Sequence, residues 1–254
     1  MDVAEFRQKL QLSGVLQTKE WGRWDWTVIE EIVDGPLENP ALLQAAMRTK
    51  FVKRLVSFLR PSNNAFANIS RKSQNSKYTQ IACQLLEILV GDDDGRAFLN
   101  SNQLLTQIGE LLRLEAEPSY SSTCKYERLF SKERVLRTLA QDYFTIIGAL
   151  SGSKPGLELL MKSRIFEHLP TLCLLPDRHD LCTIIMTCVD YNLSSSPARI
   201  VLQKALTSDN ALVRFRATRH LQVDVCVCVR ACVRACVSVC VCLSTRNYSI
   251  FGIQ

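Results

Sequence analysis

Apolar residues recur every three or four positions along most of residues 1–222, which is the spacing of an α-helix with one buried face. The clearest segments of this kind are residues 40–58, 78–91, 104–112 and 131–150. Further helices are expected to begin near Pro155, Ile165, Asp177, Pro197 and Asp209. The alternation that marks a β-strand does not run for a useful length before residue 223. The pattern therefore predicts an all-α fold.

The ends of the predicted helices carry recognisable signals. Asn39 suits an N-cap, Pro40 suits the first helical position, and Pro61 stops the helix that they begin. Gly91 closes the next helix. Two polar runs are expected to be loops, residues 62–77 and 115–130.

The helices repeat along the chain. A shift of 61 residues, from Gln80 to Gln141, places residues 80–112 on residues 141–173 without a gap. Identical positions include Gln80, Leu89, Gly91, Gly95 and Leu99 in the first copy and Gln141, Leu150, Gly152, Gly156 and Leu160 in the second. Without the loop at 115–130 the period is about 45 residues, within the range of about 40–47 found in armadillo and HEAT repeats.

A second pattern of the same kind lies near the end of this region. It follows the HEAT-repeat sequence D-x3-V-R-x2-A-x3-L at Asp209, Val213, Arg214, Ala217 and Leu221. Such units cannot bury their apolar faces alone and must stack. The sequence therefore predicts an armadillo/HEAT-like α-solenoid of stacked helical repeats. Its core should include the matched apolar residues of the two long helices, Leu86, Leu89, Ile146, Ile147 and Leu150.

Composition agrees with a folded helical protein. Hydrophobic residues make up 47% and charged residues 22%, so the chain is ordinary globular material, and 10 Gly with 8 Pro are too few for a turn-rich β-sandwich. The net charge of +6 is mild and does not indicate a nucleic-acid partner. The first ten residues lack the apolar run of a signal peptide, so we expect a cytoplasmic protein with reduced cysteines.

Residues 223–254 have a different character. Six of the 11 cysteines lie here among valines, at Cys226, Cys228, Cys232, Cys236, Cys240 and Cys242. A TG dinucleotide repeat translated in frame gives Cys-Val-Cys-Val, so we interpret this tail as a read-through or gene-model artefact. A metal site is disfavoured because the tail has no His and no paired Cys-x2-Cys. A transmembrane segment is disfavoured because Arg230 and Arg234 lie near the middle.

Patterns that carry catalysis are absent from the sequence. It has three His and no HExxH, G-x-S-x-G, G-x4-G-K-[ST] or G-x-G-x-x-G. His179, Asp180 and Cys182 could form a nucleophile site, but a helix N-terminus with a buried cysteine explains them more simply. Asp92–Asp94 are adjacent rather than alternate, which fits a helix cap better than a calcium loop. We expect no catalytic residue, no metal site and no required cofactor.

Three tryptophans lie close together at Trp21, Trp24 and Trp26. They could stack on a base or on a partner protein. The favoured interpretation is that they cover the core at one edge of the solenoid.

One group of basic residues is a candidate ligand site. Lys50, Lys53 and Arg54 are spaced i, i+3 and i+4, so they share one stripe of a helix, which Ser57 extends by a turn. Three convergent cations could hold a phosphate group by charge-assisted hydrogen bonds. The alternative is a solvated basic face without a ligand.

Several blocks of the sequence resemble the Rictor/Pianissimo family, the large helical scaffold subunit of TOR complex 2. They are RTKFVKRLVSFLRPS at 48–62, QDYFTIIGALSGSKPGLELL at 141–160, DYNLSSSPARIVLQKALTS at 190–208 and ATRHL at 217–221. The resemblance covers residues 1–222 in the family's order. It implies that residues 1–189 belong to the family's middle domain and that residues 190–222 begin the next HEAT-like domain. The tail at 223–254 lies outside the resemblance.

The resemblance also implies a function. It implies a non-enzymatic scaffold of a kinase complex that signals to AGC-family kinases, growth, survival and the actin cytoskeleton. The partners would be TOR kinase and the other TOR complex 2 subunits, in the cytoplasm or at membranes through the complex. A non-catalytic ATP or polyanion site would lie near Lys50, Lys53 and Arg54, although Ser57 stands where the family pattern has an aromatic residue. Two alternatives stay open, an armadillo/HEAT module outside TOR signalling and a regulator of small GTPases.

Overall fold

The computed structural model describes residues 1–117, 128–192 and 197–221, and its regular elements are helical. The α-helices are α1 (Val3–Leu12), α2 (Trp26–Val33), α3 (Pro40–Met47), α4 (Phe51–Leu59), α5 (Ser76–Gly91), α6 (Asp93–Ser101), α7 (Leu104–Ala116), α8 (Lys132–Arg137), α9 (Asp142–Ser151), α10 (Lys154–Lys162), α11 (Ile165–Leu174), α12 (His179–Cys188) and α13 (Ala198–Leu206). Residues 211–221 are also helical. Short 3₁₀ turns lie at Trp21–Arg23, Pro36–Glu38, Pro61–Asn63, Ser73–Asn75 and Leu139–Gln141. The interpretation of 223–254 concerns residues outside the described ranges.

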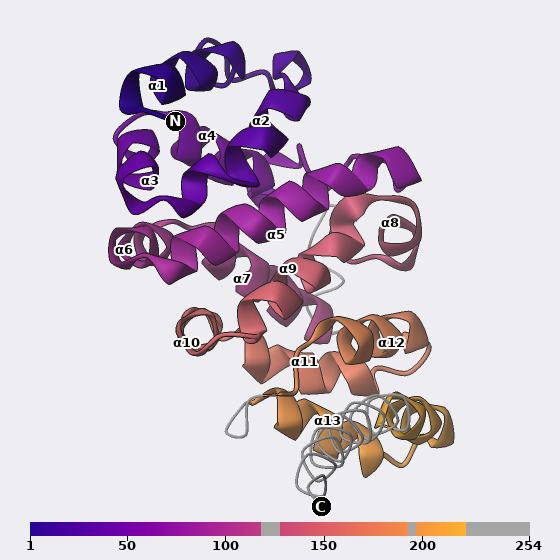
Figure 1. The fold of residues 1–254 in the computed structure, drawn as a ribbon. Helices are drawn as coiled ribbons and strands as arrows, with labels where there is room; N and C mark the ends of the chain where they lie inside the picture. Colours follow the sequence, from indigo (N-terminus) through magenta and orange to yellow (C-terminus); the bar gives the residue numbers. More distant parts are fainter. Residues whose placement is uncertain (118–127, 193–196, 222–254) are drawn as a thin grey trace, which may run out of the picture.

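The helices stack in chain order, from α1–α4 at one end to α13 at the other (Figure 1). The two copies found in the sequence are α5, α6 and α7 and then α9, α10 and α11. Each helix of the first copy packs on its counterpart in the second, α5 on α9, α6 on α10 and α7 on α11. Side-by-side contact between equivalent helices is the signature of a solenoid. The predicted all-α solenoid is therefore confirmed.

The two copies also share their local construction. Asp92 caps α6, where its Oδ2 accepts a hydrogen bond of 2.9 Å from the Gly95 N–H. Ser153, the equivalent residue, caps α10, where its Oγ accepts from the Gly156 N–H at 3.2 Å. The same position of each repeat thus satisfies one of the N–H groups that a helix start leaves without a partner.

The core runs continuously along the stack. The five predicted core residues are all at most 1% exposed: Leu86, Leu89, Ile146, Ile147 and Leu150. The prediction from the repeat is therefore confirmed at each position.

The segment predicted as one helix over 40–58 is two helices, so that prediction was wrong. The start is as expected, because Asn39 Oδ1 accepts a hydrogen bond of 2.9 Å from the Ala41 N–H. The helix stops at Met47 because the Thr49 hydroxyl donates to the Ala46 carbonyl at 2.6 Å and accepts from the Phe51 N–H at 3.1 Å. A threonine side chain that bonds the local backbone in this way competes with continued helix.

The long helix predicted from Ser131 to Leu150 is also interrupted. Thr138 is extended and forms an isolated antiparallel bridge with Ser70. The Leu139 N–H donates to the Ile69 carbonyl at 2.9 Å. The chain leaves the helix here because its backbone pairs with the 62–77 segment.

That segment was expected to be a polar loop, and it is irregular apart from its 3₁₀ turns and its last two residues, which begin α5. It also contributes to the core, since Phe66 and Ala67 are fully buried. The Phe66 ring lies 5.3 Å from Tyr143 and 5.9 Å from Phe58. Helix periodicity could not reveal these buried residues because they lie between helices.

Among the described residues, each helix is too short or too polar to cross a lipid bilayer.

Candidate functional site

Lys50, Lys53 and Arg54 line one pocket of about 640 Å³ at the α1–α4 end of the stack. Its wall includes further residues that sequence reasoning did not assign to this site, Lys19, Trp21, Trp24, Arg60 and Asn63. We call this the cationic pocket. Lys19 and the two tryptophans come from the loop before α2, which folds over α4.

The cationic pocket is strongly positive. Five basic side chains line it, Lys19, Lys50, Lys53, Arg54 and Arg60. Neither Asp nor Glu is among its described lining residues, and none of the five cations forms an ion pair within the described ranges. A concave site lined by one sign of charge concentrates ligands of the opposite charge.

Arg54 differs from the two lysines in its contacts. Its Nη1 donates to the carbonyl oxygens of Thr18, at 3.1 Å, and of Val15. Arg54 therefore ties α4 to the loop that carries Lys19. Lys50 and Lys53 are exposed, so their ammonium groups can turn toward a bound anion.

The tryptophans cover the core at this end, as predicted. Trp24 and Trp26 are 6% and 8% exposed, and the Trp26 ring lies 5.0 Å from Phe58. Trp24 Nε1 donates to the Thr18 carbonyl and Trp26 Nε1 to the Trp21 carbonyl, both at 3.1 Å. Trp21 is half-buried and also faces the cationic pocket. The sequence showed this cluster and the basic stripe, but not that folding brings the two together.

Asp180 and Cys182 have structural roles. Asp180 accepts two hydrogen bonds from Arg178, Nε to Oδ1 at 3.1 Å and Nη2 to Oδ2 at 3.0 Å. Burial alone would raise the pKa of Asp180, but the hydrogen bonds and charge of Arg178, together with backbone hydrogen bonds, hold the pKa below its usual value. Cys182 is fully buried. Among the described residues, no hydrogen bond joins His179 or Asp180 to the Cys182 thiol, and a nucleophile needs its base within hydrogen-bond reach.

The three aspartates at 92–94 are each engaged. Asp92 caps α6, Asp93 pairs with Arg96, and Asp94 accepts a hydrogen bond of 2.7 Å from Gln44 Nε2. The helix-cap interpretation of Asp92 is therefore confirmed. No group of three or more His, Cys, Asp or Glu in the described ranges is arranged to hold a metal ion.

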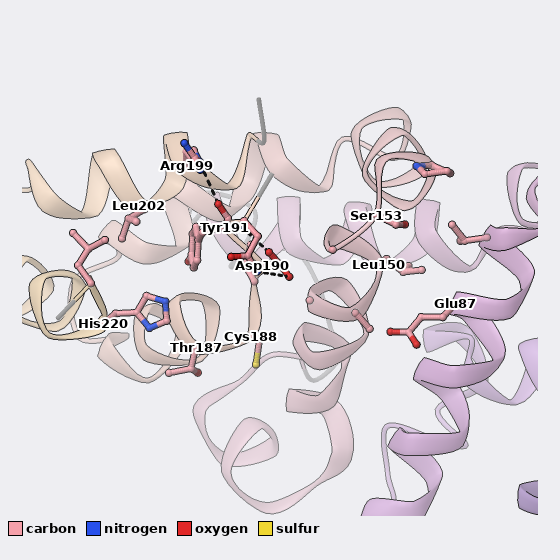
Figure 2. A pocket seen from close by; sticks show the side chains of 18 of the residues that line it. Glu87, Leu150, Ser153, Thr187, Cys188, Asp190, Tyr191, Arg199, Leu202 and His220 are labelled. Atoms are coloured by element: carbon pink, nitrogen blue, oxygen red, sulfur yellow. Dashed lines mark hydrogen bonds between the residues drawn. The ribbon is translucent and has the colours of Figure 1, made fainter. Parts of the chain in front are cut away.

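A larger pocket of about 1180 Å³ lies between α9, α12, α13 and the helix at 211–221 (Figure 2). Several of its polar groups are engaged in contacts within the protein. Arg199 Nε donates to the Tyr191 carbonyl at 3.2 Å, and the His220 ring lies 5.3 Å from the Tyr191 ring. Asp190 accepts from the Asn192 N–H at 2.7 Å. This arrangement is a seam between successive repeats, and it does not pair a nucleophile with a base.

Comparison with known proteins gives the same family over most of the chain. The family described as "Rapamycin-insensitive companion of mTOR, middle domain" matches residues 121–225. This match spans residue 190, and the domain boundary there stays a prediction. Protein pianissimo A of Dictyostelium discoideum is 39% identical over 232 residues, which cover 87% of this chain and 20% of that protein.

Two further relatives agree. Target of rapamycin complex 2 subunit ste20 of Schizosaccharomyces pombe is 34% identical and covers 87% of this chain, which spans 17% of that protein. Rapamycin-insensitive companion of mTOR of Homo sapiens is 33% identical and covers 84% of this chain, which spans 12% of that protein. The chain thus spans at most about a fifth of these relatives' length. With a helical-repeat fold and identities at this level over most of its residues, the chain belongs to the Rictor/Pianissimo family.

Proposed function

We propose that this protein is a non-enzymatic scaffold subunit of TOR complex 2. The observation that carries the proposal is 30–39% identity over most of the chain to proteins that include named subunits of target of rapamycin complex 2. A stack of helical repeats supports it, because a solenoid presents an extended surface to protein partners.

The proposal includes the partners and the place of action. TOR kinase and the other subunits of the complex would bind the protein in the cytoplasm, or at membranes through the complex. The complex would signal to AGC-family kinases and so to growth, survival and the actin cytoskeleton. The alternatives, a repeat module outside TOR signalling and a GTPase regulator, have no specific contact in the structure to favour them.

Affinity purification of the protein from its own cells tests this function. The natural gene product should be tagged at its own locus, and the co-purified proteins should be identified by mass spectrometry. TOR kinase and further complex subunits should be recovered in near-stoichiometric amounts. Recovery of the protein without TOR kinase would contradict the proposed role in TOR complex 2.

We also propose that the cationic pocket is a non-catalytic site for ATP or another polyanion. Five cations without a lining carboxylate support it, as does the half-buried ring of Trp21 in the wall. That ring could contact a base where Ser57 cannot. Lys50 and Lys53 would bind the phosphates, and Arg54 would hold the wall through Thr18.

Titration with ATP and with inositol hexakisphosphate at low and high salt tests this site. The Lys50→Gln and Lys53→Gln double variant should bind at least about a hundredfold more weakly, because each of the two lost charge-assisted bonds contributes about 1.5–3 kcal/mol. Added salt should weaken binding by the native protein. The matched control is Lys72→Gln with Lys132→Gln, two exposed lysines outside the pocket. If both variants bound these ligands with equal affinity, the pocket would be a solvated basic surface and not a ligand site.

A further inference from the structure

Helices α12 and α13 form a third unit that follows the two copies of the repeat. α12 packs on α9, and like α9 it has ten residues. α13 packs on α11. These two helices therefore continue the rows of α9 and α11. No helix among the described residues between them continues the row of the short helices α6 and α10.

The residue that caps the short helix has an equivalent in the third unit. Asp190 lies two positions after the last residue of α12, as Ser153 lies two positions after the last residue of α9. The Asp190 carboxylate accepts from the Asn192 N–H at 2.7 Å, and the Ser153 hydroxyl accepts from the Gly156 N–H at 3.2 Å. The chain after α12 thus starts as it does before α10.

The third unit has too few residues to form the short helix. Twelve positions separate the cap from the next long helix in the second copy, from Ser153 to Ile165, and the first copy has the same spacing. From Asp190 to Ala198 there are eight, about one helical turn fewer. α6 and α10 have nine residues each, so eight positions cannot hold such a helix and its connection to α13.

The pocket of about 1180 Å³ lies where this helix is missing (Figure 2). α10 packs on α9 of its own copy and on α5 and α6 of the copy before. The pocket wall includes the corresponding helices one step later, which are α12, α9 and α10. Leu150, Thr187 and Leu202 line it, from α9, α12 and α13. Its volume exceeds the range of about 300–1,000 Å³ typical of small-molecule sites, which favours a segment of protein.

The two short helices show which sequence fits this position. They share the pattern G-x2-[FL]-L, at residues 95–99 in α6 and 156–160 in α10. The last leucine of each pattern is buried, with Leu99 2% and Leu160 0% exposed. Outside this pattern both helices carry polar residues such as Arg96 and Glu158 on their exposed or half-buried face. The sequence expected at this position is therefore a short amphipathic helix.

The glycine of the pattern is required by one close approach. A Cβ on Gly156 would overlap the carbonyl oxygen of Leu150, which lies three residues before the Ser153 cap. Thr187 lies three residues before Asp190 and lines the pocket. A helix in the pocket would therefore pass the Thr187 backbone as α10 passes Leu150, and it needs a glycine at that point.

We infer that this pocket binds a short amphipathic helix of a partner protein, with a glycine followed after two residues by two large apolar residues. The bound helix takes the place of the missing short helix and completes the third unit. Its glycine lies against Thr187, and its apolar residues contact the wall that includes Leu202 and Leu206. A repeat buries its apolar face only against neighbouring helices, so a unit without its short helix leaves such a wall for a partner. The inference goes beyond the TOR complex 2 assignment and rests on neither that assignment nor the cationic pocket.

The test uses the whole 254-residue chain and a probe copied from α10. The probe is a fluorescein-labelled peptide of residues 153–164, held helical by a lactam between Glu158 and Lys162, which are four residues apart and exposed in α10. Binding is titrated by fluorescence polarisation. The control peptide carries Gly156→Leu, which raises its hydrophobicity and helix propensity but blocks the approach to Thr187. Non-specific apolar binding would favour this control peptide.

Thr187→Trp is the protein variant that fills the pocket, and Thr207→Trp is its matched control. Both threonines are exposed. Each hydroxyl donates to a carbonyl four residues earlier, Thr187 to Thr183 at 2.9 Å and Thr207 to Gln203 at 3.0 Å. Thr207 lies outside the pocket. Circular dichroism should show that both variants keep the helical fold.

The native chain and the Thr207→Trp variant should bind the probe alike, and the Thr187→Trp variant at least tenfold more weakly. The native chain should also bind the Gly156→Leu peptide at least tenfold more weakly than the probe. The Lys50→Gln, Lys53→Gln variant should bind the probe normally. Undetectable binding of the probe, equal binding of the two peptides, or equal binding by the two tryptophan variants would overturn the inference. A dimer in sedimentation velocity that Thr187→Trp alone disrupts would make a second copy of the chain the occupant, and would overturn the assignment to a partner.

Discussion

The hydroxyl of Tyr143 in α9 donates a hydrogen bond of 2.8 Å to the carbonyl oxygen of Leu59, the last residue of α4. Tyr143 is fully buried, and burial raises the pKa of its phenol. A carbonyl at a helix end has no donor within its own helix. Tyr143 supplies that donor from a residue 84 positions later, and so joins the first helices to the second repeat.

Tyr143→Phe should lower the free energy of unfolding by about 1–3 kcal/mol, because the Leu59 carbonyl would stay buried without its donor. Urea denaturation followed by circular dichroism measures this. Tyr78→Phe is the control, since Tyr78 is half-buried and its hydroxyl has no hydrogen bond within the described ranges. The two variants should differ clearly, and matching denaturation midpoints would contradict the role given to Tyr143.

Gly95→Ala and Gly156→Ala should each destabilise the fold by about 1–3 kcal/mol. A Cβ at Gly95 would overlap the backbone carbonyl oxygen of Leu89, and a Cβ at Gly156 would overlap that of Leu150. Backbone atoms cannot move aside as a flexible side chain can. Gly91→Ala is the matched control, because nothing lies within 4 Å of its added Cβ. Melting temperatures should fall for the first two variants alone.

Arg178→Met should cost about 3–5 kcal/mol of stability. Arg178 binds Glu115, Asp180 and the Phe130 carbonyl, the last at 2.7 Å. Glu115 is 5% exposed, so loss of the arginine would leave a buried carboxylate without its main partner. Chemical denaturation gives the free energy.

Arg137→Met is the control for the loss of an arginine. Arg137 pairs with Glu133 at 2.9 Å on the surface, where both side chains are well exposed. Such pairs contribute about 0–1 kcal/mol. If Arg178→Met lowered the free energy of unfolding no more than this control, the contacts of Arg178 would not stabilise the fold as proposed.

The stability of the Asp142→Asn variant relative to the native protein should increase as the pH rises. Burial raises the pKa of Asp142 above 3.8, and the hydrogen bond of 2.6 Å from Thr79 offsets this only in part. The folded state therefore binds the proton more tightly than the unfolded state, so the native protein loses stability as the pH rises from 3.8 through the raised pKa. Asparagine removes this loss and can still accept from Thr79.

Denaturation curves near pH 7 and near pH 4 measure the effect. The stability of the Asp142→Asn variant relative to the native protein should be higher near pH 7. Asp34→Asn, at an exposed position, controls for the loss of one carboxylate. If the variant were most stable relative to the native protein near pH 4, the pKa of Asp142 could not be raised in the folded state.

Much of the candidate site could be foreseen, but its contacts could not. The i, i+3, i+4 spacing placed Lys50, Lys53 and Arg54 on one pocket, because that spacing repeats on a helix face. It could not show that Arg54 bonds the Thr18 carbonyl. Nor could it show that Lys19 joins the same pocket, since no local pattern links Lys19 to α4.

The helical class and the helix starts, such as the cap at Asn39, could be predicted from the sequence because they depend on residues within about one turn of each other. The repeat could be predicted because residues 80–112 match residues 141–173 without a gap. The core positions could be predicted as well, since equivalent leucine or isoleucine residues recur in both copies. Tertiary structure decided where helices break and what the side chains meet. Thr138 leaves the helix because its backbone pairs with Ser70, and Tyr143 reaches Leu59 because the repeats stack. Such contacts join residues far apart in the chain, and helix periodicity carries no information about them.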